Sequence, residues 1–68
     1  METLNSGKLV FTAIPWDNAF IILGKEYSYQ KRRSESGLFV FYYISDSSFL
    51  NPVVISEYYI NQFAKIIN

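Results

Sequence analysis

The sequence predicts a mainly β protein: a small barrel or a strongly twisted antiparallel sheet of four to five strands, with a short C-terminal helix. Three observations support this prediction. Short apolar and aromatic runs are separated by turn-forming residues along the chain. Residues 24–44 have the pattern of a β-hairpin, with two strand-like arms around a polar tip. In the last segment, apolar residues fall at helical spacing.

The composition fits one small domain. At 68 residues, folding buries only about 60% of the surface of the unfolded chain. No cysteine is present to form a disulfide, so packing must supply the stability, and the 19% of aromatic residues suit a small core. We expect residues 8–68 to form the domain and residues 1–7 to form a flexible N-terminal lead.

The first predicted strand covers residues 8–14 and ends at Pro15, which lacks a backbone N–H donor. Residues 15–18 are expected to form a turn, since Asp and Asn side chains can bond to nearby backbone. Residues 19–23 then lead into the hairpin, and Gly24 is expected to mark a bend.

The hairpin is predicted to have a polar tip over residues 30–37 and a second arm over residues 38–44. No polar residue interrupts this second arm, whereas a half-buried strand should alternate apolar with polar residues. Both faces of the arm therefore need cover. Because side chains alternate along a strand, one face carries Leu38, Val40, Tyr42 and Ile44, and the other carries Phe39, Phe41 and Tyr43. The first arm carries Leu23, Tyr27 and Tyr29 on one face and Glu26 and Ser28 on the other, so that one face of the hairpin is apolar across both arms.

Two hypotheses explain how the face with Phe39, Phe41 and Tyr43 is covered. The C-terminal segment could lie across it with the apolar side chains of Ile60, Phe63 and Ile67, because a monomer rarely leaves a large apolar patch open. Alternatively, part of this face docks a partner, either a second copy or a different protein.

The C-terminal part begins with a turn at residues 45–48 and a short strand at residues 53–55. From Ser56, a possible N-cap, two interpretations remain open. An amphipathic helix could continue to the terminus, since Tyr59, Ile60, Phe63, Ala64 and Ile67 share one helical face. A single helical turn over residues 56–60 could instead precede a closing strand over residues 63–67.

Charge and chemistry exclude several classes of function. Six basic residues balance six acidic ones and the pI is about 6.1, whereas nucleic-acid-binding domains are usually basic. The chain has no His and no Cys, its acidic residues are scattered, and it lacks a glycine-rich phosphate loop. We therefore expect no enzyme, cofactor or metal site. No signal peptide or membrane-spanning run is visible, so a soluble, cytoplasmic protein is expected.

Two further groups of residues are candidates for binding. The basic run Lys31, Arg32 and Arg33 is either a solvated hairpin tip or a contact to an acidic partner or to phosphate. The loop residues Trp16, Asp17 and Phe20 are the other group. Trp16 either closes one end of the barrel or anchors a partner, and Phe20 and Phe49 share that ambiguity.

The order of these segments resembles small single-domain SH3-like proteins that are frequently encoded by bacteriophages. The matching residues are Leu23 to Tyr27 (Leu-Gly-Lys-Glu-Tyr), Leu38 to Ile44, Val53-Val54, Tyr58-Tyr59, Phe63 and Ile66. This loose resemblance covers most of the chain from Lys8 onward. It implies an SH3-like barrel and an accessory protein that inhibits or redirects a host factor in the host cytoplasm.

The sequence therefore favours a non-enzymatic protein-binding module. Its expected contacts are Trp16, Asp17, Phe20, Lys31, Arg32, Arg33, Phe39, Phe41 and Tyr43. One alternative is a single-stranded nucleic-acid-binding module, in which aromatic side chains stack on bases. A further alternative is a self-assembling structural component, such as a homodimer.

Overall fold

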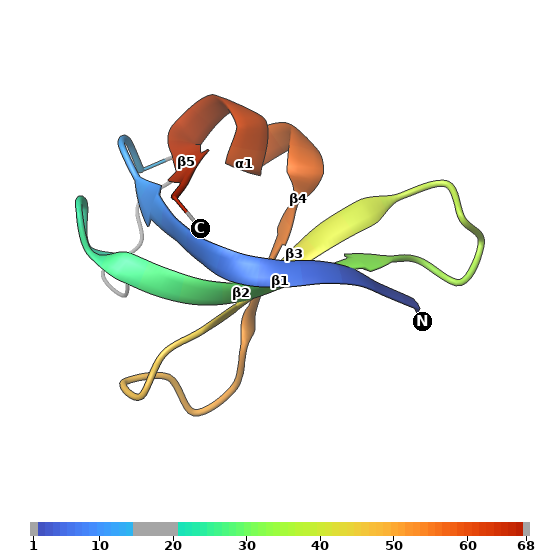
Figure 1. The fold of residues 1–68 in the computed structure, drawn as a ribbon, viewed down its shortest axis with the longest axis horizontal. Helices are drawn as coiled ribbons and strands as arrows, with labels where there is room; N and C mark the ends of the chain where they lie inside the picture. The colour runs from blue at the N-terminus through green and yellow to red at the C-terminus, as the bar shows by residue number, and fades with distance from the viewer. Residues whose placement is uncertain (1, 15–20, 68) are drawn as a thin grey trace.

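The computed structural model describes residues 2–14 and 21–67 (Figure 1). Its elements are β1 (Glu2–Phe11), β2 (Glu26–Arg33), β3 (Val40–Ser45), β4 (Val53–Ser56), α1 (Glu57–Phe63) and β5 (Ala64–Ile66). The strands form one antiparallel sheet in the order β4-β3-β2-β1-β5, which curls into a half-barrel. Helix α1 connects the two edge strands (Figure 1). The predicted fold class is confirmed.

The first strand is longer than predicted. β1 pairs with β2 from Glu2, opposite Arg33, to Val10, opposite Glu26. The structure therefore corrects the boundary at Lys8, because residues 2–7 of the predicted lead belong to the strand. Backbone hydrogen bonds to β2 hold this polar segment, so it needs no apolar run of its own, and it contains a register shift between Thr3 and Asn5.

The turn of the β2–β3 hairpin is shifted toward the C-terminus relative to the prediction. Ser34 N–H donates to the carbonyl of Phe39 at 2.8 Å, and Gly37 N–H donates to the carbonyl of Ser34 at 2.9 Å. Gly37 has φ +77°, a conformation that glycine adopts without strain. The basic run thus lies inside β2 instead of at the tip, because β1 extends the pairing of β2 as far as Arg33.

The core lies on the inner face of the curled sheet. It contains the buried side chains of Leu9, Phe11, Ile21, Tyr27, Tyr29, Tyr42, Ile44, Ile55 and Ile60. The predicted alternation of the hairpin is confirmed here, since Tyr27 and Tyr29 of β2 face inward together with Tyr42 and Ile44 of β3. Aromatic packing links the strands, with the rings of Phe11 and Tyr27 edge to face at 6.2 Å.

The C-terminal segment combines the two interpretations drawn from the sequence. α1 has seven residues, and the chain then pairs with β1 as β5, placing Ala64 opposite Phe11 and Ile66 opposite Leu9. Ile60 of α1 is buried in the inner core. The hypothesis that this segment lies across the face of Phe39, Phe41 and Tyr43 is therefore wrong, because its buried anchor packs on the opposite side of the sheet. No helix in the described part of the chain is long and apolar enough to cross a membrane.

Candidate functional site

The outer face of the sheet carries the most distinctive exposed surface. On β3, Phe41 and Tyr43 alternate with the buried Tyr42 and Ile44 and therefore point outward. The register places Phe41 between Arg32 of β2 and Ser56 of β4, and Tyr43 between Gln30 and Val54. We call the group Arg32, Phe39, Phe41, Tyr43 and Val54 the outer cluster.

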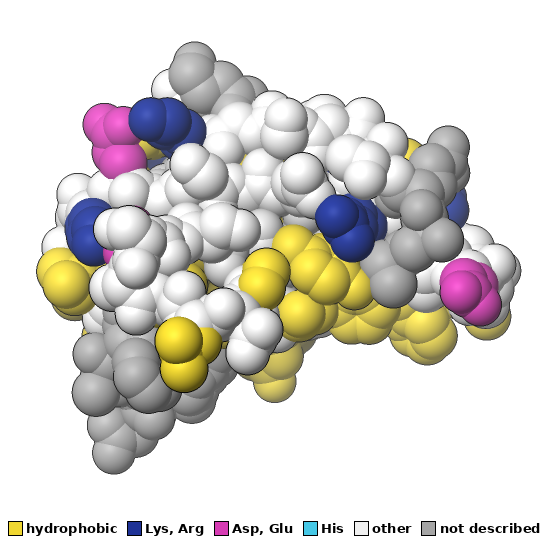
Figure 2. All heavy atoms as spheres, turned by 90° about the horizontal axis from the view of Figure 1, so that it is seen from below, with side chains coloured by type: hydrophobic (Ala, Val, Ile, Leu, Met, Phe, Trp, Pro, Cys, Tyr) yellow, Lys and Arg dark blue, Asp and Glu magenta, His cyan; other side chains and the backbone are white. Residues whose placement is uncertain are grey.

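The outer cluster is a continuous apolar and aromatic surface with one cation in it. The rings of Phe39 and Phe41 lie 6.4 Å apart, and the Arg32 guanidinium lies 4.7 Å from the centre of the Tyr43 ring. Phe39 is 60% exposed and Val54 is 51% exposed, whereas Phe41 and Tyr43 are half-buried. Figure 2 shows hydrophobic side chains gathered on the face seen from below, with a basic side chain beside them. Such a surface is typical of a binding site.

Arg32 is held within this surface. Its guanidinium donates a hydrogen bond to the side-chain carbonyl oxygen of Gln30, two residues earlier on the same strand. Its Nε atom is buried and has no hydrogen-bond partner among the described residues. Arg32 also forms no ion pair with any acidic residue that the structure describes. The charge of Arg32 is therefore partly desolvated and has no acidic counterpart among the described side chains.

The neighbouring Lys31 points to the opposite face and has a structural role. Its Nζ lies 3.0 Å from the carboxylate of Glu57 in the first turn of α1 and 5.8 Å from the centre of the Tyr42 ring. The hydrogen bond to Glu57 raises the pKa of Lys31, and burial raises the pKa of Tyr42. Lys31 thus anchors α1 against the inner side of the sheet.

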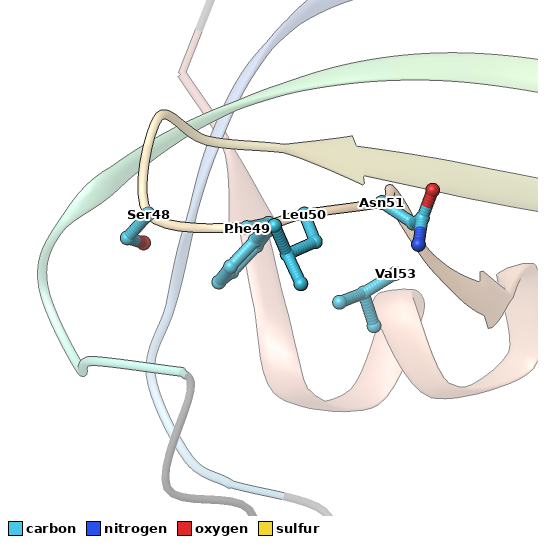
Figure 3. A pocket seen from close by; sticks show the side chains of 5 residues that line it. All are labelled: Ser48, Phe49, Leu50, Asn51 and Val53. Atoms are coloured by element: carbon cyan, nitrogen blue, oxygen red, sulfur yellow. The ribbon is translucent and has the colours of Figure 1, made fainter.

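The β3–β4 loop forms a second candidate surface (Figure 3). A shallow pocket of about 380 Å³ is lined by Ser48, Phe49, Leu50, Asn51 and Val53. Figure 3 shows Phe49 and Leu50 projecting from the loop on the same side, with Val53 beside them. The Phe49 ring stacks on Tyr27 at 5.8 Å, so it also supports the core. The lining residues carry no ionisable side chain, and the pocket therefore offers no acid–base chemistry.

An ordered polar network stabilises the start of this loop. Asp46 accepts hydrogen bonds from the backbone N–H and hydroxyl of Ser48, and it pairs with Lys25 at 3.0 Å. These bonds, those from Ser48 first, lower the pKa of Asp46 to about 2. Lys25 also lies 5.3 Å from the Tyr27 ring centre, so the network ties the loop to β2 and the preceding turn. Within the described residues, no group of three or more His, Cys, Asp or Glu side chains could hold a metal ion.

The structure brings some of the predicted site residues together and separates others. Phe39, Phe41 and Tyr43 join Arg32 in the outer cluster, whereas Lys31 faces inward and Arg33 lies exposed at the end of β2, opposite Glu2. The predicted residues Trp16, Asp17 and Phe20 lie outside the described residues.

Sequence reasoning missed Val54, a member of the outer cluster, and Gln30, which lies opposite Tyr43 on β2. Their place beside Tyr43 depends on the register of three strands. The sequence signal was the apolar pair Val53-Val54. In a strand, adjacent side chains point to opposite faces, so when one of the two faces the core the other must face outward.

Comparisons with models of protein families, with curated proteins and with solved structures find no match for this chain. The resemblance to phage-encoded SH3-like proteins therefore stays a prediction.

Proposed function

We propose that this chain is a non-enzymatic protein-binding module that engages its partner through the outer cluster. The observation that carries the proposal is that α1 packs into the inner core and leaves Phe39, Phe41 and Tyr43 on the other face. Aromatic side chains and arginine are the residues most enriched in binding hot spots. Burying one further Phe or Tyr contributes about 2 kcal/mol of apolar transfer before the costs of association.

Two details favour a protein over a single-stranded nucleic acid. The Arg32 guanidinium already lies on the ring of Tyr43, so that side of the ring is not open to stack on a base. Lys31 is paired with Glu57, which removes one of the three cations from the run that would contact phosphates. In line with the resemblance to phage proteins, the partner would be a host factor that the module inhibits or redirects by occluding its surface.

The test is a capture experiment with matched variants. The tagged protein is incubated with bacterial lysate, with and without nuclease, and so are its tagged variants Phe39→Ser and Tyr58→Ser. The captured proteins are quantified by mass spectrometry. Tyr58 is the control because it is an aromatic side chain that is 66% exposed, lies on α1 and is not a member of the outer cluster. We expect a nuclease-resistant, stoichiometric protein that Phe39→Ser loses by about tenfold or more and Tyr58→Ser retains.

Other outcomes would replace the proposal. Capture that nuclease abolishes would favour the nucleic-acid-binding alternative. Capture of untagged copies of the chain alone, together with a concentration-dependent mass in sedimentation, would favour self-assembly. Equal loss of the partner in both variants would show that the outer cluster is not the binding surface.

A further inference from the structure

We infer that Arg32 is a specificity determinant of the outer cluster and binds a carboxylate of the partner, flanked by apolar side chains. This inference rests on the proposed function, since it assigns the chemistry of the partner segment that the same surface would bind. It requires a cation that is held in place, forms no ion pair with the acidic side chains that the structure describes, and borders an aromatic surface. The structure provides all three features.

The guanidinium of Arg32 is held by its neighbours. The Tyr43 ring lies 4.7 Å from it on one side, and Gln30 accepts one of its hydrogen bonds. A side chain fixed in this way loses little conformational entropy when it binds a ligand, and its planar fork matches the two oxygens of a carboxylate. Lysine at this position would present a single point charge without that geometry.

The charge of Arg32 is not neutralised within the described part of the chain. Of the described acidic side chains, Asp46 pairs with Lys25 and Glu57 pairs with Lys31, and Glu35 lies exposed in the turn after β2 and forms no ion pair with Arg32. Glu26 shares the outer face but lies at the far end of β2, six residues away, which is roughly 20 Å along a strand. The buried Nε atom of Arg32, which has no partner, shows that this cation has already lost part of its hydration. An incoming carboxylate would compensate that loss through the Nη groups.

The surroundings of Arg32 define the rest of the ligand. Phe41 lies directly opposite it on β3, and Phe39 packs against Phe41. A carboxylate placed at Arg32 would therefore carry its neighbouring side chains onto an aromatic surface. We expect the partner segment to contain Asp or Glu beside Leu, Ile, Val or Met.

A titration followed by nuclear magnetic resonance tests this inference on the purified chain. The probes are a capped tripeptide with Asp between two Leu residues, the same peptide with Asn in place of Asp, and inorganic phosphate. The signals followed are the side-chain Nε–H of Arg32 and the backbone amides of Phe41 and Tyr43. Concentrations up to about 10 mM cover the weak affinity expected of a short peptide.

We expect the Asp peptide to shift these signals saturably and the Asn peptide to bind at least about tenfold more weakly, since a charge-assisted bond is lost. Arg32→Gln should abolish the response, and Arg32→Lys should weaken it. Lys65→Gln should leave it unchanged, because Lys65 lies on the same face but at the far edge, opposite Val10. Equal responses to the two peptides, no response at all, or a stronger response to phosphate would each overturn the inference.

This titration can fail independently of the capture experiment. If Phe39→Ser loses a captured partner but the Asp peptide leaves Arg32 unaffected, the binding function stands and the carboxylate assignment is wrong. If the Asp peptide binds at Arg32 but no protein is captured, the carboxylate site stands and the proposed function fails.

Discussion

The two faces of the β2–β3 hairpin are built from similar residues but differ in burial. On the inner face, Tyr42 and Ile44 of β3 pack with Tyr29 of β2 and are buried. On the outer face, Phe41 and Tyr43 of the same strand stay half-exposed beside Arg32. Aromatic content thus does not distinguish the core from the exposed outer face, whereas the placement of α1 does. Ile60 covers the inner face, and no described helix covers the outer one.

The first prediction tests this difference with one residue type on both faces, and it has the largest expected effect. Phe11 is 1% exposed in the inner core, whereas Phe39 is 60% exposed in the outer cluster. Phe11→Ala should lower the free energy of unfolding by about 3–5 kcal/mol, and Phe39→Ala by less than about 0.5 kcal/mol. Urea unfolding followed by circular dichroism measures both values. Similar losses in the two variants would mean that the outer cluster is part of the core.

The sequence predicted which residues face together but not which face is covered. Alternation along β2 and β3 depends only on strand geometry, so Tyr27, Tyr29, Tyr42 and Ile44 could be assigned to one side in advance. The position of α1 depends on contacts between segments far apart in the chain. Apolar residues at helical spacing around Ile60 indicate that the helix is amphipathic, but they do not say which side of the sheet it meets.

The basic run shows the same limit at the candidate site. Lys31, Arg32 and Arg33 form one charged cluster in the sequence, and the strand separates them because adjacent side chains point to opposite faces. The prediction that they lie at the hairpin tip was wrong. β2 extends to Arg33 because it pairs with the polar segment that begins at Glu2, and that segment carries no apolar pattern that would predict a strand. Local pattern alone could not supply that pairing.

The second prediction concerns the turn that joins β2 to β3 and fixes the register between these two strands. Gly37 has φ +77°, and apart from Gly37 and its two chain neighbours no residue has an atom within 4 Å of the place that a Cβ would take. Gly37→Ala should therefore cost about 1–2 kcal/mol of stability through backbone strain alone. Glu35→Ala in the same exposed turn should change stability by less than about 0.5 kcal/mol. Thermal unfolding of the two variants compares them directly. Equal effects would argue against strain at Gly37.

The third prediction follows from the ionic contact on the inner side of the sheet. The pKa of Lys31 is raised by Glu57 and that of Tyr42 is raised by burial, so the folded state holds both protons more tightly than the unfolded state. Their contribution to stability is complete below about pH 10 and is lost as the pH rises through the folded-state pKa values. Glu57→Gln should cost less than about 1 kcal/mol at pH 7 and make the alkaline loss shallower.

Urea unfolding between pH 8 and pH 11 measures this effect, and Val54→Ser supplies the outer-face control. Because Val54 carries no ionisable group, its replacement should not alter the slope above about pH 10. A slope that changes with Val54 and not with Glu57 would contradict the assignment of Lys31 to the inner contact.

The smallest effect is expected at the β3–β4 loop, which belongs to neither face of the hairpin. The pKa of Asp46 is lowered to about 2 from 3.8, so its ionised form is favoured in the folded state. This contribution is complete above about pH 4 and is lost as the pH falls through about 2. Carbon-detected titration of the Asp46 carboxyl should show this pKa, with Ser48→Ala raising it more than Lys25→Gln does, since Ser48 supplies the main hydrogen bonds. The amides of Phe41 and Tyr43 should not follow this titration, because the outer cluster contains no carboxylate. If they shift with the Asp46 midpoint, the loop and the outer cluster are coupled and cannot be treated as separate surfaces.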